Sequence, residues 1–302
     1  MSRVLVTGGT GFIGRWVIDG LLARGDEVVV FDDRPNPAAL DEIRPGLSRR
    51  VTFVTGDIAD GSVAGAVTGC DGIVHLAGVM TVDAAADPLR AAAINLVGSL
   101  HVFEAARRNA VERLVYVSTA GVFGPGDAVN PRPMTHYGAQ KLAIEGSARA
   151  FHADHGVPSV GFRPFIVYGP GQSSGIAAGP SIAIGAAARG EPATIRFSGR
   201  VGFVHVFDVA RLMVEAVSSP MQGAEAYTLC GETADMAAFV SALKAQAPHA
   251  DITVEGPPLR IPADLASSEM PEPLGGLAAT GLEEGIARTL DFYRGATAGR
   301  AT

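Results

Sequence analysis

A glycine-rich turn between a strand and a helix is the feature that most constrains this chain. Residues 3–7, RVLVT, form an apolar run typical of a buried strand, and residues 6–14 read VTGGTGFIG. The next residues place Ile13, Val17 and Leu21 on one face of a predicted helix. Glycines at such a turn let the backbone approach a pyrophosphate closely, and the helix N-terminus supplies N–H donors for its charge. The stretch therefore predicts a dinucleotide site in an α/β fold.

The glycines of this turn fit two spacing patterns. Gly9, Gly11 and Gly14 spell G-x-G-x-x-G, whereas Gly8, Gly11 and Gly14 spell G-x-x-G-x-x-G. The two patterns belong to dinucleotide enzymes that carry out different chemistry. The turn by itself leaves the choice between them open.

Apolar strands alternate with helical patterns through the first two thirds of the chain. Strands are predicted within residues 27–33, 50–58, 72–78, 113–121 and 158–169, and helices within 61–67, 87–109 and 137–155. Near-continuous apolar strands that alternate with helices predict a parallel sheet covered on both faces. Because crossover connections are right-handed, the expected fold class is α/β, with a Rossmann-like doubly wound sheet.

The composition changes after Gly169. Residues 170–200 are rich in Gly, Ala, Pro and Ser and too long for a simple connector, so they predict a helix near 180–189 and a short strand at 193–197. Residues 201–217 predict a strand that returns to the main sheet, followed by a helix. We therefore expect a dinucleotide-binding domain of residues 1–169 and 201–222, and a small C-terminal substrate-binding lobe of residues 170–200 and 223–302 that ends in a helix at 282–293.

Charge and composition exclude several classes of protein. The net charge is −7 and no basic cluster reverses it locally, so we expect no nucleic-acid partner and no binding to anionic membranes. No run of about 18 apolar residues predicts a membrane span. Cys70 and Cys230 lie far apart and form neither a metal motif nor a disulfide framework. Without a signal peptide pattern, we expect a cytoplasmic protein with no metal site.

Asp32 lies at the end of the second predicted strand and bears on which dinucleotide binds. A carboxylate there accepts hydrogen bonds from the adenosine ribose hydroxyls and repels a 2′-phosphate. Arg34 follows two residues later and could pair with such a phosphate. Asp32 has the better position, so we expect NAD as the cofactor, with NADP as the alternative.

A second set of residues predicts chemistry. Tyr137 and Lys141, in THYGAQKLAIE, lie four apart on a predicted helix and so share a face. An ammonium near a phenol favours the phenolate and lowers the pKa of the tyrosine, which suits it to move a proton. Lys141 is one of only two lysines in an arginine-rich chain. The alternative is an ordinary surface helix face.

Two hydroxyls end a predicted strand at the sheet edge where the glycine turn lies. They belong to Ser118 and Thr119, in LVYVSTAGVFG. A hydroxyl here can hold a substrate oxygen beside Tyr137. The alternative is that each hydroxyl caps its own backbone.

Together these motifs resemble the extended short-chain dehydrogenase/reductase family, in its NAD-dependent epimerase/dehydratase group. The resemblance covers roughly residues 3–212. The matching pieces are TGGTGFIG, GDI at 56–58, HLAG at 75–78, NLVGSL from Asn95, VSTAGVFG, YGAQK, RPFIVYGPG and FVHVFDVA. The resemblance implies the register of the glycine turn that contains Gly8.

The resemblance also implies roles for individual residues. It implies a catalytic set of Thr119, Tyr137 and Lys141, with Asn95 supporting a proton relay. Tyr137 would take the proton of a secondary hydroxyl, Thr119 would hold its oxygen, and Lys141 would also bind the nicotinamide ribose. The residues expected at the cofactor are Gly8, Gly11, Phe12, Ile13, Gly14, Asp32, Asp57, Ile58, Leu76, Ala77, Gly78, Ser118, Tyr137, Lys141, Pro164 and Ile166.

Three departures from the family pattern narrow the expected substrate. Ala120 and Gly121 follow Thr119 where sugar 4,6-dehydratases carry an Asp-Glu pair. Ile166 and Val201 stand where nucleotide-sugar epimerases usually carry the asparagine and arginine that contact a diphosphate. Losing such charge-assisted contacts removes roughly 1.5–3 kcal/mol each. Arg200 is displaced by one position, which on a strand turns it to the opposite face.

Three hypotheses remain. We expect an oxidoreductase that uses NAD to oxidise a secondary hydroxyl, or to reduce a ketone, of a small polar, sugar-like substrate. The first alternative is a nucleotide-sugar 4-epimerase that retains its NAD, and the second is a regulatory protein that binds NAD(H). The helices at 87–109 and 137–155 form the dimer interface in many relatives, so we also expect a homodimer.

Overall fold

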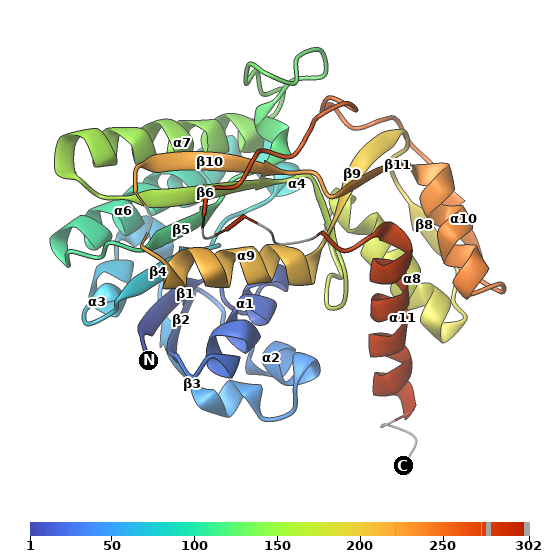
Figure 1. Ribbon diagram of the computed structural model, residues 1–302, viewed down its shortest axis with the longest axis horizontal. Coiled ribbons are helices and arrows are strands. Elements are labelled where there is room, and N and C mark those ends of the chain that lie inside the picture. Colours follow the sequence, from blue (N-terminus) through green and yellow to red (C-terminus); the bar gives the residue numbers. More distant parts are fainter. Residues whose placement is uncertain (221, 273, 276–278, 299–302) are drawn as a thin grey trace.

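The computed structural model describes residues 1–220, 222–272, 274–275 and 279–298. Its main unit is a seven-stranded sheet with the strand order β10-β6-β5-β4-β1-β2-β3, in which every neighbouring pair is parallel (Figure 1). The strands are β1 (Arg3–Thr7), β2 (Glu27–Asp32), β3 (Val51–Thr55), β4 (Gly72–His75), β5 (Leu114–Val117), β6 (Ser159–Pro164) and β10 (Ala224–Leu229). The expected α/β class and Rossmann-like sheet are confirmed.

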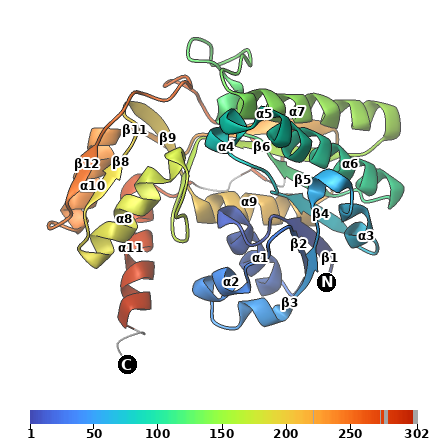
Figure 2. The same cartoon turned by 180° about the vertical axis from the view of Figure 1, so that it is seen from behind.

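Helices cover both faces of this sheet (Figures 1 and 2). In β2, Val28 and Val30 pack in one core with α1 and α9, while Val29 and Phe31 pack on the other face with α3 and α6. This alternation explains the apolar run, because a strand covered on both faces buries every side chain. The first face carries α1 (Phe12–Ala23), α2 (Pro37–Ile43) and α9 (Val206–Ser218); the second carries α3 (Val63–Val67), α6 (Gly98–Arg108) and α7 (His136–His155).

Helix α7 carries two of the expected catalytic residues and has well-defined ends. The Thr135 side chain accepts a hydrogen bond from Gly138 N and caps its first turn. Gly156 ends it with a φ of 69°, a left-handed conformation that favours glycine. The sequence between these caps is therefore held as one continuous helix.

The helix expected at 87–109 is present and contains a π-helical turn. It consists of α5 (Pro88–Ala92), the π-helical turn (Ala93–Val97) and α6, and the short helix α4 (Thr81–Ala86) precedes it. The Asp87 side chain accepts a hydrogen bond from Arg90 N and begins α5, with Pro88 at its first position. Further short turns are the 3-10 segments at Leu47–Arg50, Ile58–Asp60, Ala120–Val122 and Ile176–Ala178.

A smaller unit lies beside the carboxyl ends of the main strands. Its three-stranded sheet has the order β11-β9-β7 and encloses its own apolar core, which includes Phe203, Phe239 and Ile286. Its elements are β7 (Ile166–Tyr168), α8 (Gly179–Arg189), β8 (Ala193–Ile195), β9 (Arg200–His205), β11 (Glu232–Asp235), α10 (Met236–Gln246), β12 (Ile252–Val254) and α11 (Leu282–Ala298). Strands β8 and β12 form a separate parallel pair.

Two strands belong to other sheets than the sequence predicted. Strand β9 does not return to the main sheet but pairs with β7 and β11, whereas β10 joins the main sheet beside β6. The apolar run at 158–169 also differs from the prediction of a single strand. It divides at Phe165 into β6 of the main sheet and β7, which pairs with β9 in the second sheet. Strand β10 is an edge strand with partly exposed side chains, so its apolar pattern is weak.

The described residues contain no helix with both the length and the apolar character needed to cross a membrane.

Candidate active site

Two adjoining cavities lie at the carboxyl ends of the main strands. Both are lined by Gly8, Gly11, Leu76 and Gly78, so together they form one cleft. The larger, of about 760 Å³, is lined by five aspartates and is called here the acidic cavity. The smaller, of about 400 Å³, is lined by Thr119, Tyr137 and Lys141 and is called the tyrosine cavity. This position is where ligands bind in doubly wound sheets.

The glycine turn forms the floor shared by both cavities. Gly8 has a φ of 64°, and a Cβ added there would lie 2.8 Å from Ala77 N. A Cβ on Gly14 would lie 2.7 Å from Gly8 O and from the Gly9 backbone. At Gly9 the nearest atoms belong instead to side chains of the core. Backbone contacts at Gly8 and Gly14 thus favour the register that contains Gly8, and they form a cradle suited to a pyrophosphate.

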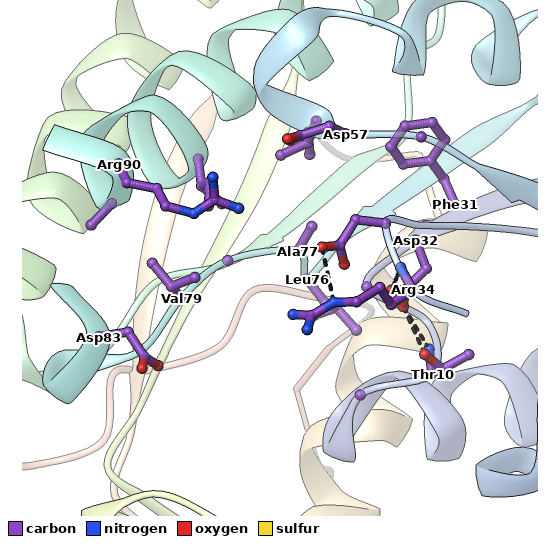
Figure 3. Close-up of a pocket in the computed structure, with 18 of the residues that line it drawn as sticks. Thr10, Phe31, Asp32, Arg34, Asp57, Leu76, Ala77, Val79, Asp83 and Arg90 are labelled. Atoms are coloured by element: carbon purple, nitrogen blue, oxygen red, sulfur yellow. Dashed lines mark hydrogen bonds and ion pairs between the residues drawn. The ribbon is translucent and has the colours of Figure 1, made fainter. Parts of the chain in front are cut away.

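The acidic cavity contains Asp32 at the end of β2 (Figure 3). Its Oδ2 accepts a hydrogen bond of 2.7 Å from the Thr10 hydroxyl, and its Oδ1 accepts one of 3.1 Å from Arg34 N. The Arg34 guanidinium extends into solvent and pairs with Asp33 at 3.3 Å. Asp57, on the far side of the cavity, caps the short turn that follows it by accepting from Ala59 N. The excess of carboxylates over guanidinium groups fits ribose hydroxyls better than an extra phosphate.

Arg90 is a lining residue that the sequence did not single out. It extends from α5 into the acidic cavity on the side of Asp57 (Figure 3). Within the described part of the chain its guanidinium has no ion-pair partner within 4.0 Å. It is therefore a free cation at the cavity wall opposite Arg34.

The tyrosine cavity contains the expected chemical groups. Tyr137 and Lys141 lie on one face of α7, with Lys141 Nζ 5.8 Å from the centre of the Tyr137 ring. Lys141 Nζ donates to Val117 O at 2.9 Å, the last residue of β5. Thr119 Oγ1 accepts from Gly121 N at 3.0 Å. Because this bond occupies a lone pair of Thr119, its O–H remains able to donate to a bound oxygen.

Burial shifts the pKa values of both Lys141 and Tyr137 in this cavity. It lowers the pKa of Lys141 to about 8, against the opposing effect of the nearby Glu145 carboxylate. It also raises the pKa of Tyr137 well above its usual range. The sequence led us to expect a lowered tyrosine pKa; instead, burial of the phenol raises it in this arrangement.

Three expected site residues lie differently from their predicted roles. Ser118 lines the tyrosine cavity, but its hydroxyl donates to Glu145 Oε1 at 2.5 Å. Asn95 is fully buried, bonded to the Val79 backbone and to Gln140, and lines neither cavity. Ile166 is packed in the core of the smaller unit and also lines neither cavity. The side chains before and after it, Phe165 and Val167, do line the tyrosine cavity, so alternation along β7 turns Ile166 into the core.

The cleft brings the remaining expected residues together. The two cavities are lined by Gly8, Gly11, Phe12, Ile13, Gly14, Asp32, Asp57, Ile58, Leu76, Ala77, Gly78, Ser118, Thr119, Tyr137, Lys141 and Pro164. Sequence reasoning missed Met80, Phe165, Val167 and Gln172 in the tyrosine cavity. Their only sequence signal is adjacency to recognised motifs, which does not identify a lining side chain.

The loop that follows β7 is anchored from three directions. Gly171 O accepts from Arg15 Nη2 at 2.7 Å, and Pro170 O accepts from Trp16 Nε1 at 3.0 Å. Gly171 N donates to the Tyr293 hydroxyl on α11 at 3.0 Å. Since Arg15 and Trp16 follow the glycine turn directly, α1 links the floor of the cleft to the loop that borders it.

Val201 and its neighbour Arg200, the residues of β9 considered for the recognition of a diphosphate, do not reach the cleft. Val201 is buried in β9, and Arg200 before it is exposed, as alternation along the strand predicts. Neither residue lines the two cavities.

Comparisons with known proteins bear on this arrangement. Residues 4–230 match the family model described as the NAD dependent epimerase/dehydratase family. The chain is 30% identical to a UDP-glucose 4-epimerase of Mycolicibacterium smegmatis over 97% of this chain and 98% of that protein. It is 32% identical to a 3-beta-hydroxysteroid dehydrogenase of Mycolicibacterium neoaurum over 58% of this chain and 50% of that protein.

Solved structures give the same picture. A Thermus thermophilus UDP-glucose 4-epimerase in complex with NAD superimposes with a TM-score of 0.80 at 29% identity, covering 97% of this chain and 99% of that one. A Thermotoga maritima UDP-glucose 4-epimerase with UDP-glucose gives a TM-score of 0.84 at 26% identity, covering 98% and 99%. The cradle of Gly8 and Gly14, with Asp32 beyond it, fits the cofactor named by the family. The chain belongs to the NAD-dependent epimerase/dehydratase family, within the extended short-chain dehydrogenases/reductases, and is an NAD-dependent enzyme.

Proposed function

We propose that this enzyme exchanges a hydride between NAD and the secondary carbinol carbon of a small polar, sugar-like substrate. One observation carries the proposal: Thr119, Tyr137 and Lys141 converge on a cavity that shares its floor with the glycine cradle. A proton acceptor, a hydroxyl donor and a cation therefore lie together beside a dinucleotide-shaped cleft. The smaller unit supplies part of the cavity wall and is proposed to select the substrate.

In this proposal the adenosine half of NAD lies in the acidic cavity and the nicotinamide half lies in the tyrosine cavity. Gly8, Gly11 and Gly14 receive the pyrophosphate, with N–H donors from the first turn of α1. Asp32 accepts from the adenosine ribose hydroxyls, and Asp57 and Ile58 lie at the adenine. A bound cofactor would supply the redox chemistry, with NAD as the acceptor of a hydride from the carbinol carbon and NADH as the donor of a hydride to a ketone.

The acid–base steps belong to three side chains. Thr119 donates its free O–H to the substrate oxygen, which fixes that oxygen beside Tyr137. Tyr137 takes the hydroxyl proton in oxidation and returns it in reduction. Because burial makes a phenolate costly, the transfer needs a nearby cation, and Lys141 supplies it from the same helix face.

A nucleotide-sugar 4-epimerase is the second candidate. It is favoured by the similarity to the Mycolicibacterium smegmatis epimerase over nearly the whole length of both chains. It is opposed by Ile166 and Val201, because both side chains are apolar, are packed in the core of the smaller unit and line neither cavity. The two candidates differ in net redox change: a dehydrogenase releases NADH when its alcohol is added, whereas an epimerase retains its NAD and converts one sugar into another.

Replacement of the proton acceptor tests the proposal. Sugars, sugar acids, polyols and nucleotide sugars are first screened with NAD, following both NADH absorbance and sugar epimerisation. Tyr137→Phe is expected to lower kcat about 10²- to 10⁴-fold with the substrate found, because general acid–base catalysis is lost. NAD affinity, measured by calorimetry, is expected to stay close to that of the parent.

The control is Tyr227→Phe, since Tyr227 lies half-buried in β10 and lines neither cavity. Near-parent turnover in Tyr137→Phe would remove the assignment of this tyrosine. If the parent protein does not bind NAD, the proposed function is wrong.

We also propose that the chain forms a homodimer through the helices at residues 87–108 and α7. The support is exposed apolar surface on this side: Leu89 on α5 is 85% exposed and Val97 is 42% exposed. Both lie on the continuous helical segment at residues 88–108, and a partner subunit on this segment would cover them. A monomeric mass by light scattering at micromolar concentration would contradict the proposal.

A further inference from the structure

One face of α7 carries a third functional group beyond the tyrosine and the lysine. Tyr137, Lys141 and Glu145 follow each other at four-residue intervals, so they lie in one row along the helix. Glu145 is fully buried, with a side-chain exposure of 0%. A buried carboxylate is costly unless charged and hydrogen-bonded partners compensate it, so its contacts are informative.

Glu145 has three hydrogen bonds to two partners. Arg163, on β6, donates from Nε to Oε1 at 2.8 Å and from Nη2 to Oε2 at 2.6 Å. Ser118, at the end of β5, donates its hydroxyl to Oε1 at 2.5 Å. The bidentate geometry fixes both the carboxylate and the guanidinium.

These contacts hold both ends of the turn that carries Thr119. Ser118 precedes the turn at Ala120–Val122, and Phe123 follows it. The guanidinium of Arg163 lies over the Phe123 ring, with Cζ 5.5 Å from the ring centre. Lys141 meanwhile holds Val117 O. Glu145 is thus connected, directly or through Arg163, to the residues on either side of Thr119.

The Glu145 charge also acts on Lys141, one helical turn away. Burial lowers the pKa of Lys141, and the Glu145 carboxylate opposes that effect. Among the described residues, the titratable groups around this pair and its partners come from α7 and from four strands. They are Tyr137 and Arg149 on α7, His75 on β4, Tyr116 on β5, Arg163 on β6 and Glu225 on β10. Burial holds the pKa of His75 at about 3 and raises that of Tyr116, so both are neutral at pH 7. Glu225 acts on Tyr116 and Arg163, whereas the carboxylate that acts on Lys141 is that of Glu145.

We propose that Glu145 is a positioning residue for the reaction: its carboxylate holds the Ser118–Phe123 turn that presents Thr119 and keeps Lys141 in its ammonium form. This inference rests on the proposed function for its catalytic meaning. Its second part does not require a known substrate for its test, because the charge of Lys141 can be observed directly.

Lysine NMR gives that observation. The chain has only two lysines, Lys141 and Lys244, so protein made with lysine carrying ¹³C at Cε shows two lysine signals. Lys244 is exposed on α10 and serves as an internal reference. In Glu145→Gln the titration midpoint of Lys141 is expected to fall by about 1 pH unit, because an opposite charge is removed at close range. With the substrate from the screen, the loss of kcat/KM at high pH is expected to begin about 1 pH unit lower.

The matched control is Glu104→Gln, on α6. Glu104 also pairs with arginines, Arg107 at 2.7 Å and Arg108 at 2.6 Å, but it lies at the surface away from the cleft. This variant is expected to leave the Lys141 midpoint unchanged. Ser118→Ala keeps the charge and removes one hydrogen bond, so it is expected to lower kcat without moving the Lys141 midpoint.

The outcomes separate three cases. An unchanged Lys141 midpoint in a folded Glu145→Gln protein overturns the inference, even if thermal stability falls. Should that variant not fold, Glu145→Gln with Arg163→Gln removes the unpaired buried guanidinium, and its Lys141 midpoint is then compared with that of Arg163→Gln alone, below which it is expected to lie by about 1 pH unit. Failure of the proposed function is a separate outcome. It would appear as full activity in Tyr137→Phe, whatever the Lys141 midpoint is.

Discussion

The two cavities of the cleft differ in how exposed their charged side chains are and in how these side chains are hydrogen-bonded. In the acidic cavity the two arginine side chains extend into open space: Arg34 is 90% exposed, and Arg90 has no ion-pair partner in the described chain. In the tyrosine cavity nearly every polar group is buried and bonded to another one behind it, as Lys141, Ser118 and Glu145 illustrate. The difference indicates that one half recognises a ligand by direct contact, while the other depends on residues that never touch it.

The largest effect is expected from a change in the glycine turn, because this turn lines both cavities. Gly14→Ala places a Cβ 2.7 Å from three backbone atoms, none of which can move without shifting the turn. Overpacking of this kind costs about 1–3 kcal/mol, so NAD affinity is expected to fall about 10- to 100-fold. Calorimetric titration with NAD measures it.

Gly65→Ala is the matched control for that change. Gly65 lies in α3, and an added Cβ would meet no atom within 4 Å. Replacing a helical glycine by alanine is expected to leave NAD binding unchanged and to stabilise the fold by about 0.5–1 kcal/mol. Equal binding by the two alanine variants would show that the turn does not need its glycine at position 14.

Asp32 tests whether the acidic cavity works by direct contact. In Asp32→Asn the side chain keeps its shape and loses its charge, so NAD is expected to bind about tenfold more weakly while the preference against NADP decreases. Dissociation constants for both dinucleotides measure the change. Asp33→Asn, which alters a neighbouring carboxylate paired with Arg34, is expected to have little effect. A similar loss in both variants would indicate that only the total charge matters.

Arg90 gives the smallest expected effect. A guanidinium stacked on an aromatic base contributes about 0.5–1 kcal/mol at an exposed site, so Arg90→Ala is expected to weaken NAD binding about threefold. Nicotinamide mononucleotide, which lacks the adenosine, is expected to bind equally to parent and variant. Arg189→Ala, which removes an exposed arginine paired with Glu191 on α8, is the control. An unchanged affinity for NAD in Arg90→Ala would place this arginine outside the binding site.

The sequence predicted those parts of the fold that depend on short stretches. The apolar strands, the glycine turn and the capped helix α7 are each encoded within a few consecutive residues, and each is present in the structure. The boundary between the two units was missed because it depends on which strands pair across the chain. Strand β9 lies beside β7 and β11, and no local pattern specifies these partners.

The candidate site shows the same limit. The residues on recognisable motifs line the cleft, but the hydroxyl of Ser118 and the amide of Asn95 are turned to other partners. Glu145 was visible in the sequence as the next position on the face of Tyr137 and Lys141. Its importance depends on Arg163 of β6, which tertiary packing brings to it, so spacing alone did not identify it.

The repeated passage of the chain between the two units has a practical consequence for protein engineering. After β6 the chain enters the smaller unit, returns with α9 and β10, leaves again for β11 and α10, and comes back to place Leu274 in the main core before α11. No single cut in the described chain therefore yields two separately expressible fragments with intact cores. An altered substrate range is better sought by replacing side chains and loops at the cleft than by exchanging a whole lobe.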